Sequence, residues 1–198
     1  MHQELPRLIL ASASPRRQQL LRDAGYDFVV RPADIHENEC PYGLLPVELA
    51  RHLSMLKAAA VSPHFPHDVV LAADTVVAFG DRHLGKPSDP VEARRMLSLL
   101  AGTTHTVITG VTVIRRATAF QQTRHAISAV RMRRLSLQEI QDYVASRQWE
   151  GKAGGYGLQD PDPFVTKQSG SHTNVVGLPM ELTRKMLADA DIRPNQKP

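Results

Sequence analysis

Residues 7–25 read RLILASASPRRQQLLRDAG, and this stretch sets the architecture of the chain. The apolar run at 7–11 predicts a short buried strand. Ser14 can cap a helix that Pro15 begins, since the first helical position needs no backbone N–H. The helix continues to Gly25, a residue type that commonly ends helices. A strand that leads straight into a helix is typical of α/β proteins.

Helices and strands alternate through the rest of the sequence, which predicts the α/β class. Further strands are predicted at 26–32, 69–74, 105–116, around 126–135, at 164–168 and at 174–178. Further helices are predicted from Pro46, at 92–102, at 135–146 and at 179–190, with loops at 79–90 and 149–163. The two long middle strands are expected to be antiparallel neighbours. No repeat or linker divides the sequence, so we expect a single domain over residues 1–198.

The helix predicted from Pro46 has an apolar face that its sequence spacing reveals. Leu49, Leu53, Leu56 and Ala60 fall on one side at helical spacing. Lys57, four residues after Leu53, is expected at the edge of that face.

The composition excludes several classes of protein. With 42% hydrophobic and 22% charged residues, the chain is neither disordered, collagen-like nor a disulfide scaffold. Its single cysteine, Cys40, cannot form an internal disulfide, which fits a reducing cytoplasm. The longest apolar runs are too short to span a membrane or to serve as a signal peptide. A formal charge of +4 favours anionic partners, although ordinary surface charge is the commoner explanation.

The SASPRR segment at 12–17 is a candidate phosphate site. The start of a helix presents unpaired N–H groups and a partial positive charge. Ser12 and Ser14 add hydroxyl donors, and Arg16 and Arg17 add guanidinium groups that match phosphate oxygens. A plain capped helix with two solvated arginines is the alternative. The segment lacks the spacing of a Walker loop.

Two carboxylates are candidates for metal binding or proton transfer. Asp74 closes the apolar run VVLAAD and precedes Thr75, and ligands of open α/β sheets bind beyond the carboxyl ends of strands. Glu37, in the loop segment ADIHE, is a second candidate ligand for a divalent cation. A turn or cap aspartate and a solvated loop glutamate are the alternatives.

Three lysines and a glycine-rich segment complete the candidates. Lys57, Lys86 and Lys152 each lie beside small or rigid residues, which suits phosphate binding by a point charge, although solvated lysines are commoner. In GKAGGYGLQ at 151–159, Tyr156 and Gln159 could stack on a base or bind its edge, and a simple turn is the alternative.

Taken in order, these segments resemble the Maf family of nucleoside triphosphate pyrophosphatases. The resemblance is carried by LILASASPRR, DIHE, LARHLSMLKA, AADTVVAFGDRHLGKP, EARRMLSLLAGTTHTVITGV, GKAGGYGLQ and GSHTNVVGLP. It implies an elongated central mixed sheet flanked by helices, forming two lobes with a cleft between them. It also implies hydrolysis between the α- and β-phosphates with a divalent cation, Mg²⁺ or Mn²⁺, to give a nucleoside monophosphate and pyrophosphate.

The resemblance further implies roles for individual residues. Asp74 would be the general base or direct the metal, and Glu37 would assist metal binding. Ser12, Arg16, Lys57 and Lys86 would hold phosphates. Arg16, Thr75 and Gln159 match the positions associated with base choice, in the form typical of members that hydrolyse dTTP and UTP rather than 7-methyl-GTP.

The chain departs from the family pattern at two positions near these residues. His36 stands where an acid usually precedes the glutamate, which removes one carboxylate from the expected metal site. Asp160 replaces the usual glycine after Gln159. This difference bears on which nucleobase the protein prefers more than on which reaction it catalyses.

Two other functions compete with hydrolysis. A nucleic-acid-binding module using the arginine-rich middle strands is disfavoured by the few aromatic residues and the lack of an RNA-binding signature. A regulator of septum formation would bind nucleotide without turnover. We expect a cytoplasmic enzyme that acts on nucleoside triphosphates without nucleic-acid or membrane partners, and the resemblance implies a homodimer.

Overall fold

The computed structural model describes residues 5–35, 43–161 and 163–195, and their centre is a mixed seven-stranded sheet. The strands run in the order β2-β1-β3-β5-β6-β7, with β4 also paired to β3. Their bounds are β1 Leu8–Leu10, β2 Val29–Val30, β3 Val69–Phe79, β4 Arg82–Leu84, β5 Thr104–Arg115, β6 Phe120–Met132 and β7 Val165–Ser169. β1 is parallel to β2 and β3, whereas the other pairs are antiparallel. The predicted α/β class with an elongated mixed sheet is confirmed.

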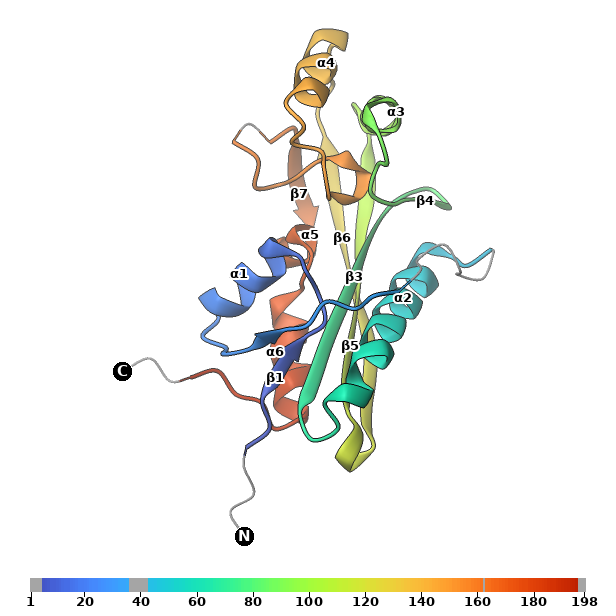
Figure 1. The fold of residues 1–198 in the computed structure, drawn as a ribbon. Coiled ribbons are helices and arrows are strands. Elements are labelled where there is room, and N and C mark those ends of the chain that lie inside the picture. The colour runs from blue at the N-terminus through green and yellow to red at the C-terminus, as the bar shows by residue number, and fades with distance from the viewer. Residues whose placement is uncertain (1–4, 36–42, 162, 196–198) are drawn as a thin grey trace.

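Helices cover both faces of the long strands (Figure 1). α2 lies along one face, α1, α5 and α6 lie on the other, and α3 and α4 gather at one end of the sheet. Their bounds are α1 Pro15–Asp23, α2 Pro46–Val61, α3 Pro90–Leu100, α4 Leu137–Ala145, α5 His172–Val176 and α6 Met180–Asp189. Within the described residues, none of these helices has the length and hydrophobicity that crossing a bilayer requires.

The first strand and helix form as predicted. The Ser14 hydroxyl accepts a hydrogen bond from the backbone N–H of Arg17 at 3.4 Å, and Pro15 occupies the first turn of α1. Gly25 follows the helix with a φ of 80°, a left-handed conformation that a residue with a side chain adopts only with strain. The cap at Ser14 and a hydrogen bond from the backbone N–H of Ala11 to the carbonyl oxygen of Leu71 hold the loop between β1 and α1 at both ends, which positions residues 11–14.

β3 is longer than predicted, and this changes the setting of Asp74. The strand continues past Asp74 to Phe79, so the prediction that Asp74 terminates a strand is wrong. The apolar, β-branched residues after Thr75 extend the pairing with β5 as far as Ala78. It is β1 that ends nearby, since its pairing with β3 stops at Leu71.

Two other predictions from local sequence are also wrong. NVVGL at 174–178 was expected to be a strand, but His172–Val176 form the helix α5. The Ser171 hydroxyl accepts from the backbone N–H of Asn174, and this cap outweighs the strand preference of two valines. The loop predicted at 79–90 contains β4, which turns back at Gly80 and pairs with the end of β3.

α2 presses one face against the sheet at Gly110. A Cβ atom on Gly110 would lie 2.1 Å from the carbonyl oxygen of Ala50, so the helix backbone can approach this closely only over glycine. The buried side of α2 contains Lys57 in line with Leu53 and Val61, whereas Ala60 is exposed. Lys57 thus lies within the buried face, not at its edge as predicted.

The two largest core clusters lie toward opposite ends of the sheet. One contains Ala73 of β3 with residues of α1 and α6, and the other contains Val77 of β3 with residues of α3 and α4. Thr75 lies between them on the same strand. The strand therefore passes from one core to the other at Asp74 and Thr75, where the candidate site is found.

Candidate active site

A cavity of about 530 Å³ opens beside the middle of β3. β5 pairs with one edge of β3 from Val70 to Ala78, so β1 and β4 share the opposite edge. β1 pairs with that edge up to Leu71, and the pairing with β4 begins at Val77, which leaves a gap between the two strands. The cavity lies at this gap, where side chains from both faces of the sheet can reach one space.

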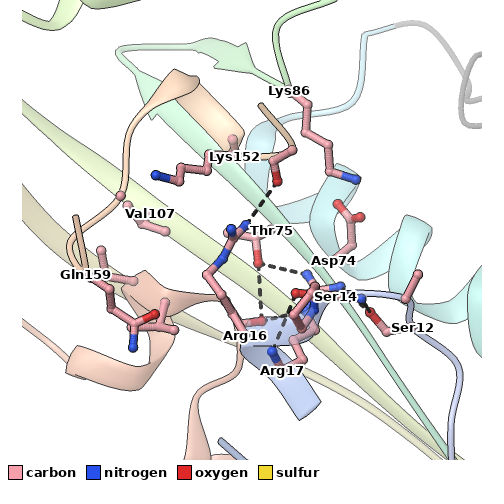
Figure 2. Close-up of a pocket in the computed structure, with 18 of the residues that line it drawn as sticks. Ser12, Ser14, Arg16, Arg17, Asp74, Thr75, Lys86, Val107, Lys152 and Gln159 are labelled. Carbon is pink, nitrogen blue, oxygen red and sulfur yellow. Dashed lines mark hydrogen bonds between the residues drawn. The ribbon is translucent and has the colours of Figure 1, made fainter. Parts of the chain in front are cut away.

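Nearly all of the predicted site residues meet in this cavity. The lining includes Ser12, Ser14, Arg16, Arg17, Lys57, Asp74, Thr75, Lys86 and Gln159. In the view of Figure 2, Asp74, Ser12 and Lys86 lie toward one side, Gln159 toward the other, and Arg16 between them. The remaining predicted residue, Glu37, lies outside the described residues, as does His36.

Asp74 and Lys57 form a buried ion pair at one side of the cavity. Lys57 Nζ lies 2.5 Å from Asp74 Oδ1, and each side chain is only 10% exposed. Asp74 points toward the face covered by α2, since its pairing partner on β5 is Gly110. Lys57 reaches it from the C-terminal half of that helix, so the carboxylate is held in a fixed orientation.

Arg17 joins α1 to the opposite face of β3. Its guanidinium donates to Ser12 Oγ at 3.1 Å, to Thr75 Oγ1 at 3.1 Å and to the carbonyl oxygen of Gly177 at 2.8 Å. Thr75 in turn lies 3.0 Å from the hydroxyl of Thr109 on β5. Arg17 lines the cavity, and these bonds let it position Ser12 and Thr75.

Arg16 bridges the cavity toward the glycine-rich segment. Its guanidinium donates to the carbonyl oxygen of Gly151 at 3.0 Å. Burial lowers the pKa of Arg16 from its usual value, while the nearby Asp160 carboxylate acts in the opposite direction. The start of α1 and the segment after α4 thereby approach each other across the cavity.

The other two candidate lysines differ in their surroundings. Lys86 is exposed, and in Figure 2 it extends toward the side of the cavity that holds Asp74. Lys152 forms an ion pair with Asp160, and its side chain is 14% exposed. An exposed ammonium at the rim suits phosphate binding, whereas Lys152 already has a carboxylate partner.

Tyr156 is placed differently from the sequence-based interpretation. It is only 6% exposed, and its hydroxyl lies 2.5 Å from Nε2 of His105. Burial raises the pKa of Tyr156 and lowers the pKa of His105 to about 4, so both groups are neutral at physiological pH. Tyr156 therefore forms part of the wall and does not present a free ring for stacking on a base.

Sequence reasoning missed the partners that organise the glycine-rich segment. Tyr143 of α4 donates to Asp160 Oδ2 at 2.7 Å, and His105 of β5 supports Tyr156. Both partners lie outside the motif, on α4 and β5, so the spacing of residues within the motif does not predict them. The one available signal is the presence of Asp160 itself, an acid in a segment rich in glycine and proline.

Of the two carboxylates predicted to bind a divalent cation, Asp74 lies among the described residues and Glu37 lies outside them. In the described part of the chain, no three or more His, Cys, Asp or Glu side chains come together as a metal site. Oδ1 of Asp74 accepts a hydrogen bond from Lys57, and Oδ2 is the carboxylate oxygen that could bind a cation. Because Mg²⁺ is commonly held by one or two carboxylates together with substrate phosphates, Asp74 fits such a cation when a polyphosphate is bound.

Comparison with known proteins identifies the family of this chain. The model of the Maf-like protein family matches residues 7–190. The chain belongs to the Maf family. A dTTP/UTP pyrophosphatase of Cereibacter sphaeroides is 48% identical over 93% of this chain and 95% of its own length. A dTTP/UTP pyrophosphatase of Hyphomonas neptunium is 49% identical over 91% of this chain and 93% of its own.

Among solved structures, a nucleoside-triphosphatase or dITP/XTP pyrophosphatase from Mycobacterium abscessus is 14% identical to this Maf protein. The match covers 96% of this chain and 100% of that chain, with a TM-score of 0.45.

Proposed function

We propose that this Maf protein hydrolyses dTTP and UTP to the nucleoside monophosphate and pyrophosphate. The observation that carries the proposal is the position of the Asp74 carboxylate, held by Lys57 in a cavity lined by Arg16, Lys86 and the start of α1. The relatives named dTTP/UTP pyrophosphatase support the same reaction.

Asp74 is assigned as the general base. It takes a proton from a water molecule whose oxygen attacks the α-phosphorus, and the bond from that phosphorus to the bridging oxygen breaks. Lys57 holds Oδ1, which leaves Oδ2 to face the water or a cation. Such transfer reactions depend mainly on positioning and on neutralising charge, which a rigid buried pair provides.

A divalent cation bound at Asp74 would neutralise charge on the phosphates and lower the pKa of bound water. Glu37 is the second ligand that the family resemblance implies. The chain's own residues hold the polyphosphate: the partial positive charge at the start of α1, the Ser12 hydroxyl, and the cations Arg16 and Lys86.

The nucleobase of the substrate is assigned to the side of the cavity opposite Asp74. Gln159 lines this side, and Val107 of β5 contributes an apolar surface beside it. Thr75 lies on the same face of the sheet as its partner Thr109, away from Asp74. In this arrangement the triphosphate lies at the gap in the sheet edge, and the nucleobase lies over the face of the sheet that carries Thr75.

A screen of nucleoside triphosphates tests the proposal. The wild-type protein is incubated with UTP, dTTP, CTP, GTP and ATP in the presence of Mg²⁺, Mn²⁺ or a chelator, and both products are identified. Release of pyrophosphate and UMP or dTMP, with lower rates for the purine nucleotides, is the expected result. Release of orthophosphate would assign cleavage to another bond, and binding without any release would favour the regulatory alternative.

The assembly and location remain proposals of the same kind. We infer a homodimer and a cytoplasmic enzyme from the family resemblance, and light scattering of the purified protein tests the first.

A further inference from the structure

The carboxylate of Asp160 is the anchor of the glycine-rich segment. One of its oxygens pairs with Lys152, and the other accepts from the hydroxyl of Tyr143 at 2.7 Å and from the backbone N–H of Gly157 at 2.9 Å. The side chain is only 10% exposed. Three donors from α4, from the start of the segment and from its middle thus converge on one buried charge.

Gly157 shows how closely the chain wraps around this carboxylate. A Cβ atom on Gly157 would lie 2.7 Å from Asp160 Oδ1, so a larger residue could not occupy the position without displacing the acid. Burial and the bond to Asp160 raise the pKa of Tyr143, which keeps its hydroxyl protonated as a donor. The Lys152 ammonium also lies 6.0 Å from the centre of the Tyr143 ring.

Gln159 depends on this anchor for its place in the cavity. It is exposed, and among the described residues no hydrogen bond from another side chain holds its amide. Its position follows from the backbone on either side, which Asp160 fixes through Gly157 and Lys152. The same segment carries Gly151, whose carbonyl oxygen accepts from Arg16 on the facing side of the cavity.

We propose that Asp160 is a specificity-determining positioning residue. It holds residues 151–159 close enough to the facing side of the cavity that a pyrimidine fits between them and a purine does not. This inference rests on the proposed function and adds a residue of this chain that contributes to base choice. A segment tied by charged hydrogen bonds resists the outward shift that a two-ring base requires, whereas a freed segment yields to it. Asp160 acts through Gln159 and the backbone and touches no reacting atom.

The test compares base preference in variants that remove one bond each. Asp160→Asn keeps the shape but loses the charge that pairs with Lys152, and Tyr143→Phe removes one donor. For each, kcat/KM is measured with UTP and with GTP. We expect the UTP:GTP ratio to fall about tenfold in Asp160→Asn and less in Tyr143→Phe, mainly through KM, as for loss of a charged hydrogen bond.

Asp142→Asn is the matched control, because Asp142 is an exposed acid one residue before Tyr143 whose carboxylate, among the described residues, accepts a hydrogen bond only from Gln138. It should keep the wild-type ratio. A merely structural role for Asp160 would reduce turnover of all nucleotides alike, so an unchanged ratio in both Asp160→Asn and Tyr143→Phe overturns the proposal. Thermal unfolding identifies a variant that fails to fold, and the other variant then decides.

Binding separates this inference from the proposed function. Affinities for the α,β-methylene analogues of UTP and GTP, which resist cleavage at that bond, give the same ratio without turnover. If the wild-type protein binds the UTP analogue but releases no pyrophosphate, the hydrolytic function fails while the Asp160 inference is still decided by the variants. Equal binding of both analogues by the wild-type protein contradicts the inference directly.

Discussion

Lys57 and Asp74 meet across the contact between α2 and β3, with Nζ 2.5 Å from Oδ1 and both side chains 10% exposed. The pair connects the helix with the strand at the point where the cavity opens. A buried ion pair of this kind contributes little net stability, because desolvation offsets the attraction. Its value lies in fixing the direction of one carboxylate.

Replacement of Asp74 by asparagine should abolish most of the activity. Asp74→Asn retains the shape and removes the base, and we expect turnover to fall about 100-fold or more. Pyrophosphate release is the measurement, with circular dichroism to show folding. Asp81→Asn, at an exposed turn after β3, is the control and should leave the rate unchanged. Near-normal turnover in folded Asp74→Asn would remove the assigned role.

Loss of Lys57 should destabilise the protein more than loss of the whole pair. Lys57→Met leaves the Asp74 carboxylate buried without this partner, at a cost of about 3–5 kcal/mol. The double variant with Asp74→Leu removes both charges and should recover much of that free energy of unfolding, without activity. Urea unfolding measures both, and Lys185→Met on the exposed side of α6 is the control. If Lys57→Met matches the wild-type stability, the pair is not buried as described.

Gly110 should not tolerate alanine. A Cβ atom there would lie 2.1 Å from the Ala50 carbonyl oxygen, so Gly110→Ala must push α2 away from the sheet. We expect a loss of about 1–3 kcal/mol, the usual range for overpacking, together with reduced turnover because α2 carries Lys57. Gly85→Ala is the matched control, since no heavy atom of the described residues lies within 4 Å of its added carbon. Equal stability of the two variants would contradict the close approach of α2.

Acid should weaken the fold through His105. Burial lowers the pKa of His105 to about 4, whereas the unfolded chain has a histidine pKa near 6.5. The unfolded state therefore binds more protons between these values, and the stability that the neutral imidazole provides is present above pH 6.5 and lost as the pH falls toward 4. The linkage relation gives a loss of about 2 kcal/mol between pH 7.5 and pH 5.

Urea unfolding at both pH values, in the wild-type protein and in His105→Gln, measures this contribution. His125, whose pKa is also lowered by burial and by Arg51, adds a change of the same sign in both proteins. The difference between them isolates His105. Parallel pH profiles would show that His105 is not responsible.

A carboxylate at position 159 should shift base choice. A glutamine amide can donate to and accept from the uracil edge, whereas the carboxylate of Gln159→Glu only accepts and suits the donor edge of guanine. We expect the UTP:GTP ratio of kcat/KM to fall about tenfold. Gln168→Glu, on the exposed part of β7, is the control. A constant ratio would show that Gln159 does not read the base.

Much of the fold follows from local signals. The cap at Ser14, Pro15 and the apolar run before them predict β1 and α1 because each acts within a few residues. α5 could not be predicted in this way, since the two valines of NVVGL favour a strand and only the cap at Ser171 reverses that preference. Asp74 looked strand-terminal because the sequence does not reveal that β5 continues to pair beyond it.

The candidate site was predictable in its members but less so in its connections. The family motifs supplied Ser12, Lys86 and Gln159 as candidates, and the structure places all three in one cavity. The ties from Arg17 to Gly177 and from Tyr143 to Asp160 join residues that are 160 and 17 positions apart. No pattern in a single sequence encodes such pairings, which depend on how the layers pack.

Asp74 and Thr75 are neighbours in the chain, yet they point to opposite sides of the sheet. The Asp74 carboxylate is held by Lys57 of α2, and the nucleobase is assigned to the layer built from α5 and the segment after α4. Substitutions in the second layer can thus redirect the enzyme toward other nucleotides while the ion pair in the first stays intact. Proteins with this sheet can therefore change their nucleotide preference while keeping the same ion pair.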